Sequence, residues 1–219
     1  MALTVLEVAT AANIAIRQQF DLSDSDQLAL FIQWVDQVHK DVLHTSPVWR
    51  VFNTASATIT SSVAGSPYAL TTTVREIVVV QDLQNSRVLI PWTDVNFPAA
   101  SSAPPEKSGP PADKWMQSLK TNVPYPQFYL PEVAAAGGYI GKLHLLPDPS
   151  TVDYAGTIRY FYTKVVESVT ASGDTLVMPD DGLDVMVAGV AMHASNFLPR
   201  PTEADRWAAL YGVLKRGNV

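Results

Sequence analysis

The spacing of apolar residues changes twice along this 219-residue chain, and that change limits the possible folds more than any other feature of the sequence. Apolar residues recur at three- and four-residue intervals near both ends, which is typical of amphipathic helices. From about Trp49 to Val177 the pattern becomes short β-branched runs between Gly, Pro, Asn and Ser, which is typical of strands and turns. The chain is therefore expected to be an α+β protein, with a helical bundle formed by both ends and a β-rich domain inserted between them.

Helix start and stop signals mark the predicted end segments. Thr4 and Glu7 have the spacing of a capping box, and Ser23 and Asp26 repeat that spacing before a second helix, which Pro47 stops. Thr202 and Asp205 offer a third such pair, and Gly217 is a suitable helix end. The apolar faces predicted for the four helices are Val5, Val8, Ala12 and Ile16; Leu28, Phe31, Ile32, Val35, Val38 and Val42; Leu183, Met186, Val187, Val190, Ala194 and Phe197; and Trp207, Leu210, Tyr211 and Leu214.

The middle of the chain contains five predicted strands and one segment that cannot be a strand. The strands expected in the inserted antiparallel domain are 57–60, 75–81, 87–91, 138–146 and 157–169, the last with a bend or break near Val166. Residues 97–113 contain five prolines, which exclude a continuous helix or a central strand. This segment is predicted to be a long proline-rich arm, and the alternative is a flexible surface insertion.

Composition excludes several classes of protein. The content of 47% hydrophobic and 16% charged residues predicts a real core, and a net charge of −6 argues against general nucleic-acid binding. The chain has no cysteine, so disulfides and thiolate sites are excluded. No secretory signal or membrane span is recognisable, so we expect synthesis in the cytoplasm.

No catalytic or metal-binding constellation is recognisable, so neither an enzyme nor a cofactor is expected. His39, His44, His144 and His193 lack metal-site spacing, and no GxSxG motif is present. The acidic residues Asp180, Asp181 and Asp184 precede an apolar helix, where capping is a simpler explanation than cation binding.

In their order along the chain, several short motifs resemble the head–tail adaptor (connector) proteins of tailed bacteriophages, which form a ring beneath the portal. After two N-terminal helices that end near Trp49, the resembling segments are Tyr68-Ala-Leu70, Val74–Val80, Pro126-Gln-Phe-Tyr129, Leu143-His-Leu-Leu-Pro-Asp-Pro149, Arg159–Tyr162 and Met178-Pro-Asp-Asp-Gly-Leu-Asp184. The resemblance extends from about Leu3 to Leu198. The arm at 97–113 is not a required feature of the family.

The resemblance implies a structural role in the virion, at the head–tail interface. Such adaptors form homo-oligomeric rings, typically twelvefold, that bind the portal protein and the tail nozzle protein while DNA passes through the bore. It implies three segments here: 1–48 as the N-terminal helices, 49–178 as the inserted β-rich domain with its arm, and 179–219 as the C-terminal helices and docking tail.

Two groups of residues are the expected contact sites in such a ring. Trp207, Tyr211, Lys215 and Arg216 are predicted to dock on the portal, so removing the residues after Leu198 would abolish docking and leave the core folded. The contacts expected with a neighbouring subunit or the nozzle are Phe97, Pro104, Pro105, Pro110 and Trp115.

Two other classes of function remain open at this point. A β-sandwich module that binds glycans or peptides could use exposed aromatic residues near Trp92 and Trp115, although helices at both ends are not expected of such a module. A hydrolase could assemble Ser, His and Asp residues that are distant in sequence.

Overall fold

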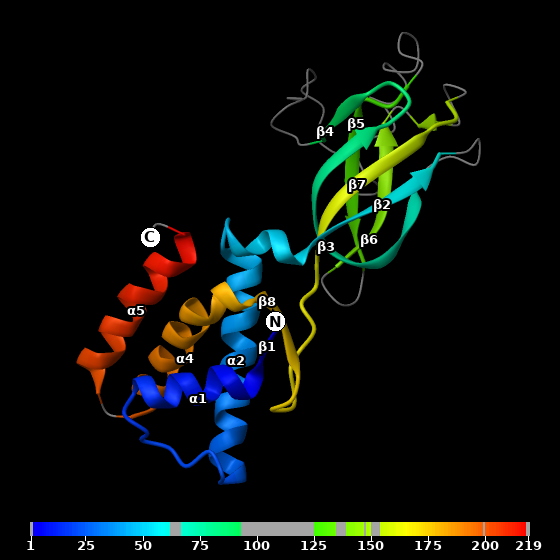
Figure 1. The fold of residues 1–219 in the computed structure, drawn as a ribbon. Helices are drawn as coiled ribbons and strands as arrows, with labels where there is room; N and C mark the ends of the chain where they lie inside the picture. The colour runs from blue at the N-terminus through cyan, green and yellow to red at the C-terminus, as the bar shows by residue number, and fades with distance from the viewer. Residues whose placement is uncertain are drawn as a thin grey trace, which may run out of the picture. The chain divides into compact units, whose positions relative to one another are not determined.

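The computed structural model describes residues 2–61, 67–92, 125–134, 139–146, 148–149, 154–198 and 200–217. The chain is an α+β protein with two compact units (Figure 1). Both ends of the chain build the helical unit, Met1–Asn53 with Val166–Val219, and the intervening Thr54–Val165 builds the β unit. The two units have separate hydrophobic cores.

The boundaries of the helical unit differ from the expected 48/49 and 178/179. The short helix η1 (Trp49–Asn53) packs against the second long helix, and strand β8 (Thr175–Pro179) pairs with β1 (Ala2–Thr4). Polar contacts hold the preceding segment as well, because Asp36 accepts a hydrogen bond from the Val169 N–H (3.0 Å). Residues 49–53 and 166–178 therefore belong to the helical unit. Strands β1 and β8 were not predicted.

Two helices begin the helical unit. Helix α1 (Val5–Ala15) starts with the predicted capping box of Thr4 and Glu7. Helix α2 (Ser25–Thr45) is capped by Asp24, whose side chain accepts hydrogen bonds from the N–H groups of Asp26 and Gln27, and not by the predicted Ser23. Asp24 takes this role because its carboxylate reaches two of the free N–H groups in the first turn.

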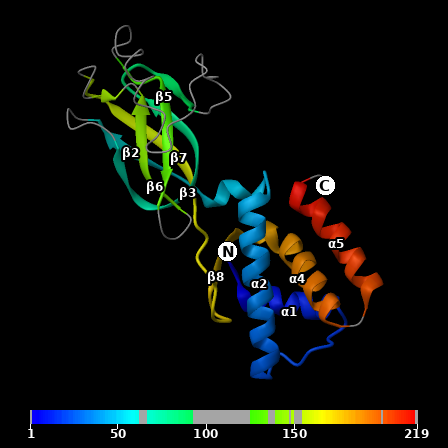
Figure 2. The ribbon, with the colours of Figure 1, turned by 180° about the vertical axis from the view of Figure 1, so that it is seen from behind.

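Two further helices complete the helical unit. Helix α4 (Leu183–Phe197) follows the short helix η3 (Asp180–Gly182), and helix α5 (Pro201–Arg216) has Pro201 in its first turn. The predicted Thr202–Asp205 cap is wrong, since Arg200 is the N-cap residue and α5 has no side-chain cap. Gly217 ends α5 with φ of 71°, as the sequence indicates. In both views, α4 lies between α2 and α5 (Figures 1 and 2).

The core of the helical unit contains the apolar faces of α1, α2 and α4. Its fully buried members include Val5, Val8, Ala12, Phe31, Val35, Val38, Val42, Met186, Val190 and Ala194, all of which the sequence places on helix faces. Within the described residues, no helix is long and apolar enough to cross a membrane.

The β unit contains six strands in the order β2-β7-β3-β4-β5-β6, and β3 also pairs with β6. Four strands, β3–β6, thus form a closed circuit, which β7 and β2 extend. The strands are β2 (Thr54–Thr60), β3 (Tyr68–Asp82), β4 (Arg87–Pro91), β5 (Phe128–Val133), β6 (Ile140–Leu146) and β7 (Thr157–Lys164). All pairings are antiparallel except β4 with β5, which is parallel and departs from the expected antiparallel domain.

Alternation along β7 produces much of the β unit's core. Ile158, Tyr160 and Tyr162 are buried, whereas Arg159 between them is exposed. The strand ends at Lys164, close to the break predicted near Val166, and the residues from Val166 to Val169 belong to the helical unit.

Candidate functional site

The four residues predicted to dock on the portal lie on α5, but three of them face the helical unit itself. Tyr211 is buried, and Trp207 and Lys215 are half-buried. Trp207 packs against the helical core, and Arg216 is exposed. Trp207, Tyr211 and Lys215 therefore hold α5 onto its own unit.

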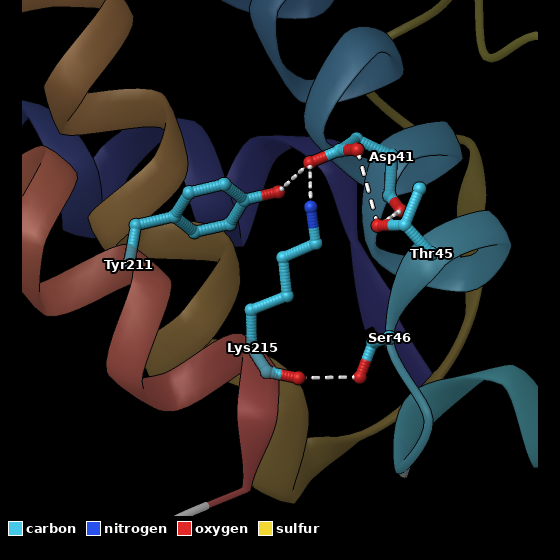
Figure 3. A network of polar contacts seen from close by, with 5 residues as sticks. All are labelled: Asp41, Thr45, Ser46, Tyr211 and Lys215. Carbon is cyan, nitrogen blue, oxygen red and sulfur yellow. Dashed lines mark hydrogen bonds and ion pairs between the residues drawn. The ribbon is translucent and has the colours of Figure 1, made fainter.

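A polar network joins α5 to the end of α2 (Figure 3). One carboxylate oxygen of Asp41, Oδ2, accepts hydrogen bonds from the Tyr211 hydroxyl and from Lys215 Nζ, each at 2.6 Å. The Thr45 hydroxyl donates its proton to the Asp41 backbone carbonyl at 2.7 Å and lies 3.2 Å from the other carboxylate oxygen, Oδ1. The Asp41 carboxylate thus receives a cation and the Tyr211 hydroxyl, which offset its charge at a partly buried position.

These contacts shift the proton affinities of the network. Burial raises the pKa of Asp41, but the hydrogen bonds from Lys215 and Tyr211, together with the Lys215 charge, outweigh it and hold that pKa below its usual value. Burial, followed by the hydrogen bond to Asp41, raises the pKa of Tyr211. Asp41 is therefore ionised and Tyr211 remains a donor at neutral pH.

Ser46 adds a second connection at the same end of α2. Its hydroxyl donates to the Lys215 carbonyl at 2.5 Å and accepts from the N–H groups of Val48 and Trp49. One buried side chain thus ends α2, turns the chain into η1 and holds the last turn of α5.

Gly189 on α4 has no side chain, and this allows Val38 of α2 and Tyr211 of α5 to pack closely against α4. A Cβ atom at this position would lie 2.6 Å from Val38 Cγ1 and 3.0 Å from a ring carbon of Tyr211. Only glycine leaves room for these two side chains at once. Since α5 also places Ala204 and Tyr211 in the buried interior, removing the residues after Leu198 is now expected to destabilise the helical unit, contrary to the expectation from sequence.

The opposite face of α5 carries the residues that could meet a partner. Leu210 and Val213 are 43% and 46% exposed, and Arg206 and Arg216 are exposed on the same helix. Val48 is also exposed. It lies beside the end of α5, since a Cβ added at Gly217 would be 2.4 Å from Val48 Cγ2. We call Val48, Arg206, Leu210, Val213 and Arg216 the α5 outer surface.

The sequence contained a signal for this division of α5. Ala204, Trp207, Tyr211 and Leu214 follow one another at three- and four-residue intervals and face inward, whereas Arg206, Leu210 and Val213 follow the same intervals on the other side. The sequence interpretation assigned Leu210 to the buried face, and only Arg216 of the predicted docking residues lies on the α5 outer surface.

The second group of predicted contact residues, Phe97, Pro104, Pro105, Pro110 and Trp115, lies outside the described residues, as does the whole arm at 97–113.

His39 and His144 make polar contacts with other parts of the fold. His39 is buried, and its Nε2 accepts a hydrogen bond from the Val177 N–H at 3.2 Å. His144 Nε2 lies 2.8 Å from a Glu132 carboxylate oxygen across the β5–β6 pair. Among the described residues, no group of three or more His, Asp or Glu side chains could hold a metal ion.

The acidic residues before α4 do not cap it with their side chains. The N-cap residues of η3 and α4 are Pro179 and Gly182, neither of which has a capping side chain. Asp180, Asp181 and Asp184 instead lie in the first turns of η3 and α4, where negative charge is favourable near the helix dipole.

Comparison of the chain with models of protein families and with curated proteins finds no match.

Proposed function

We propose that the protein is a head–tail adaptor of a tailed bacteriophage, which assembles as a ring, twelvefold in the typical case, between the portal and the tail nozzle. The observation that carries the proposal is the insertion of the β unit, Thr54–Val165, between two halves of one helical unit. That arrangement is the one expected from the resemblance, and it supports a structural role in the neck of the virion.

The distribution of charge supports a subunit that DNA passes without being held. The helical unit has seven Lys and Arg residues against thirteen Asp and Glu, a net charge of −6, whereas the β unit has eight of each and no net charge. Neither unit has the excess of cations that retains DNA through its phosphates. In the proposed ring, the bore lets DNA through without reading its sequence.

In this proposal the α5 outer surface docks on the portal. It combines exposed apolar side chains at Leu210 and Val213 with the cations Arg206 and Arg216, on a unit that is otherwise acidic. Tryptophan and tyrosine, the original candidates, instead stabilise the helix that presents this surface. The arm at 97–113 remains the proposed contact with a neighbouring subunit or the nozzle.

Native mass measurement with and without the portal ring of the same phage tests the proposal. We expect the 23.8 kDa chain to join the portal as a ring with a subunit number that matches the portal. A protein that does not bind the portal at any ratio would contradict the adaptor function.

A double substitution tests the docking surface separately. Leu210→Asp with Val213→Asp should abolish binding to the portal, because charged side chains replace the apolar side chains of the α5 outer surface. Both residues are exposed, so the replacement leaves the core of the helical unit intact. Ile14→Asp, on an exposed position of α1, is the matched control and should bind as the unsubstituted protein does. Equal binding by all three proteins would refute docking through α5.

A further inference from the structure

Strand β2 has one open edge. It is the first strand in the order of the six-stranded sheet and, within the described residues, it pairs with β7 alone. At seven residues it is the longest described strand that is paired on one side only, since β1 has three residues and β8 has five. An open edge of this kind presents unpaired N–H and C=O groups to another strand.

The hydrogen bonds at the end of β2 show which residues present those groups. The Ser61 N–H donates to the Gly156 carbonyl at 2.8 Å, so the backbone of Ser61 points toward the β7 side. Directions alternate along an antiparallel strand, so the backbone groups of Ser56, Thr58 and Thr60 point away from β7. All three residues are exposed.

This edge lacks the devices by which soluble proteins usually prevent strand pairing. The sequence Thr54–Thr60 contains no charged residue and no proline, and its register with β7 is regular, without a bulge. Lysines, prolines and bulges are the common protections of an exposed edge. Their absence from Thr54–Thr60 leaves an uncharged edge without a bulge, which another strand can extend.

The edge of strand β8 in the helical unit, unlike that of β2, is protected. There, the outward N–H of Val177 on β8 donates to the buried His39, and the strand ends at Pro179. A side chain thus occupies the edge of the shorter strand, whereas the edge of β2 is left open within the described residues.

We propose that β2 pairs with the β2 strand of a second copy of this chain, antiparallel and across a two-fold axis. A contact between two different edges would need a second open strand, and the described alternatives are the three-residue β1 and the occupied β8. Strand β2 therefore pairs with the same strand of the second copy, as a two-fold interface requires. The Ala, Ser and Thr side chains of both strands are small enough to lie opposite one another.

Charge favours the same partner. The β unit has eight basic and eight acidic residues, so two copies approach through their β units without net repulsion. The helical unit, with thirteen acidic against seven basic residues, would repel its own copy. This inference concerns the free protein and does not rest on the adaptor ring, whose cyclic contacts are of a different kind.

The first test measures the mass of the full chain by sedimentation over a wide concentration range. We expect a shift from the 23.8 kDa monomer toward the dimer as concentration rises. In hydrogen–deuterium exchange at the highest concentration, the amides of Ser56, Thr58 and Thr60 should gain protection, whereas those of Ala55 and Ala57 should not change. A constant monomer mass, or a dimer in which the three amides stay unprotected, would overturn the proposal. So would protection of these amides only when a peptide or protein of another sequence is added.

Replacing Thr58 by residues of opposite charge gives the second test. Thr58 is the middle one of the three outward-pointing residues, so a symmetric pair centred there places it opposite Thr58 of the second copy. Thr58 also lies opposite Arg159 of β7, so Thr58→Glu gains an opposite charge within its own chain but meets the same glutamate of the second copy. We expect dimerisation to weaken about tenfold or more. Dimerisation of Thr58→Lys should weaken likewise, and an equal mixture of the two variants should dimerise more strongly than either variant alone.

A matched control is Thr175→Glu, an exposed threonine on the other sheet, which should dimerise as the unsubstituted protein does. Undiminished dimerisation of Thr58→Glu alone would overturn the pairing. Failure of the mixture to dimerise, with both variants folded by circular dichroism, would overturn it equally.

Discussion

At the scale of single residues, His39 is the titratable group most deeply buried in the helical unit. It is 1% exposed, and its neutral ring accepts the Val177 N–H, which connects α2 to β8. Its pKa falls from 6.5 to about 4, chiefly because of burial. The nearby Asp36 opposes this fall, and the charges of Lys40 and His44 add to it. The ring therefore remains neutral in the folded protein at pH values where it is protonated in the unfolded chain.

This difference predicts a fall in stability with acid. Because the unfolded chain binds the proton more readily, stability is full above about pH 6.5 and decreases as the pH falls toward 4. The loss is on the order of 2–3 kcal/mol. Urea unfolding of the helical unit at a series of pH values measures it.

His39→Gln is the informative variant for that prediction. Glutamine keeps an acceptor for Val177 but has no proton to gain, so most of the pH dependence between 6.5 and 4 should disappear. His193 contributes a smaller remainder, since burial lowers its pKa too. A pH profile that His39→Gln leaves unchanged would assign the effect to other groups.

At the scale of helices, two glycines of the same bundle have opposite surroundings. Gly189 on α4 lies against Val38 and Tyr211, whereas a Cβ added at Gly212 on α5 would have no atom of another described element within 4 Å. Both lie inside helices, where alanine is intrinsically favoured over glycine by about 1 kcal/mol. Packing therefore decides the sign at each position.

The pair gives a matched prediction. Gly189→Ala should lower the free energy of unfolding by about 1–3 kcal/mol, because the methyl group would force Val38 or Tyr211 to move. Gly212→Ala should raise it by about 0.5–1 kcal/mol. Chemical denaturation of the two variants beside the unsubstituted protein measures both. Two changes of the same sign would show that packing does not distinguish these positions.

The elements also show what the sequence could predict and where it could not. Long amphipathic stretches such as α2 were predictable, because their stripes are decided locally by the 3.6-residue repeat. Strands β1, β5 and β8 were missed; β5 contains Pro131, and β1 and β8 are short and depend on each other for pairing. The parallel β4–β5 pair joins segments far apart in the chain, which local patterns do not report.

The candidate site was only partly predictable for a similar reason. The sequence identified α5 and its aromatic residues, but an aromatic side chain can face a partner or its own core. Tyr211 faces inward because Asp41, 170 residues earlier, supplies an acceptor at 2.6 Å. The periodicity of α5 divides the helix into two sides but does not show which side meets the core, and so the exposed Leu210 and Val213 were not recognised.

At the scale of the whole molecule, each unit has a core of its own. The helical core draws its members from both ends of the chain, and the β core from residues 74–162. In the described residues the long helices belong entirely to the helical unit. The far-ultraviolet helical signal therefore reports one unit, and calorimetry reports both.

We expect these cores to unfold in two transitions, because compact units with their own cores commonly fold independently. Gly189→Ala should lower the midpoint that the helical signal follows and leave the other unchanged. Leu143→Ala, at a fully buried position of β6, should lower the midpoint of the β unit and leave that of the helical signal unchanged. We expect it to lower the free energy of unfolding of the β unit by about 2–5 kcal/mol. If both variants instead displace one common transition, the units unfold together, and the β unit would then act as a structural part of the helical unit that it interrupts.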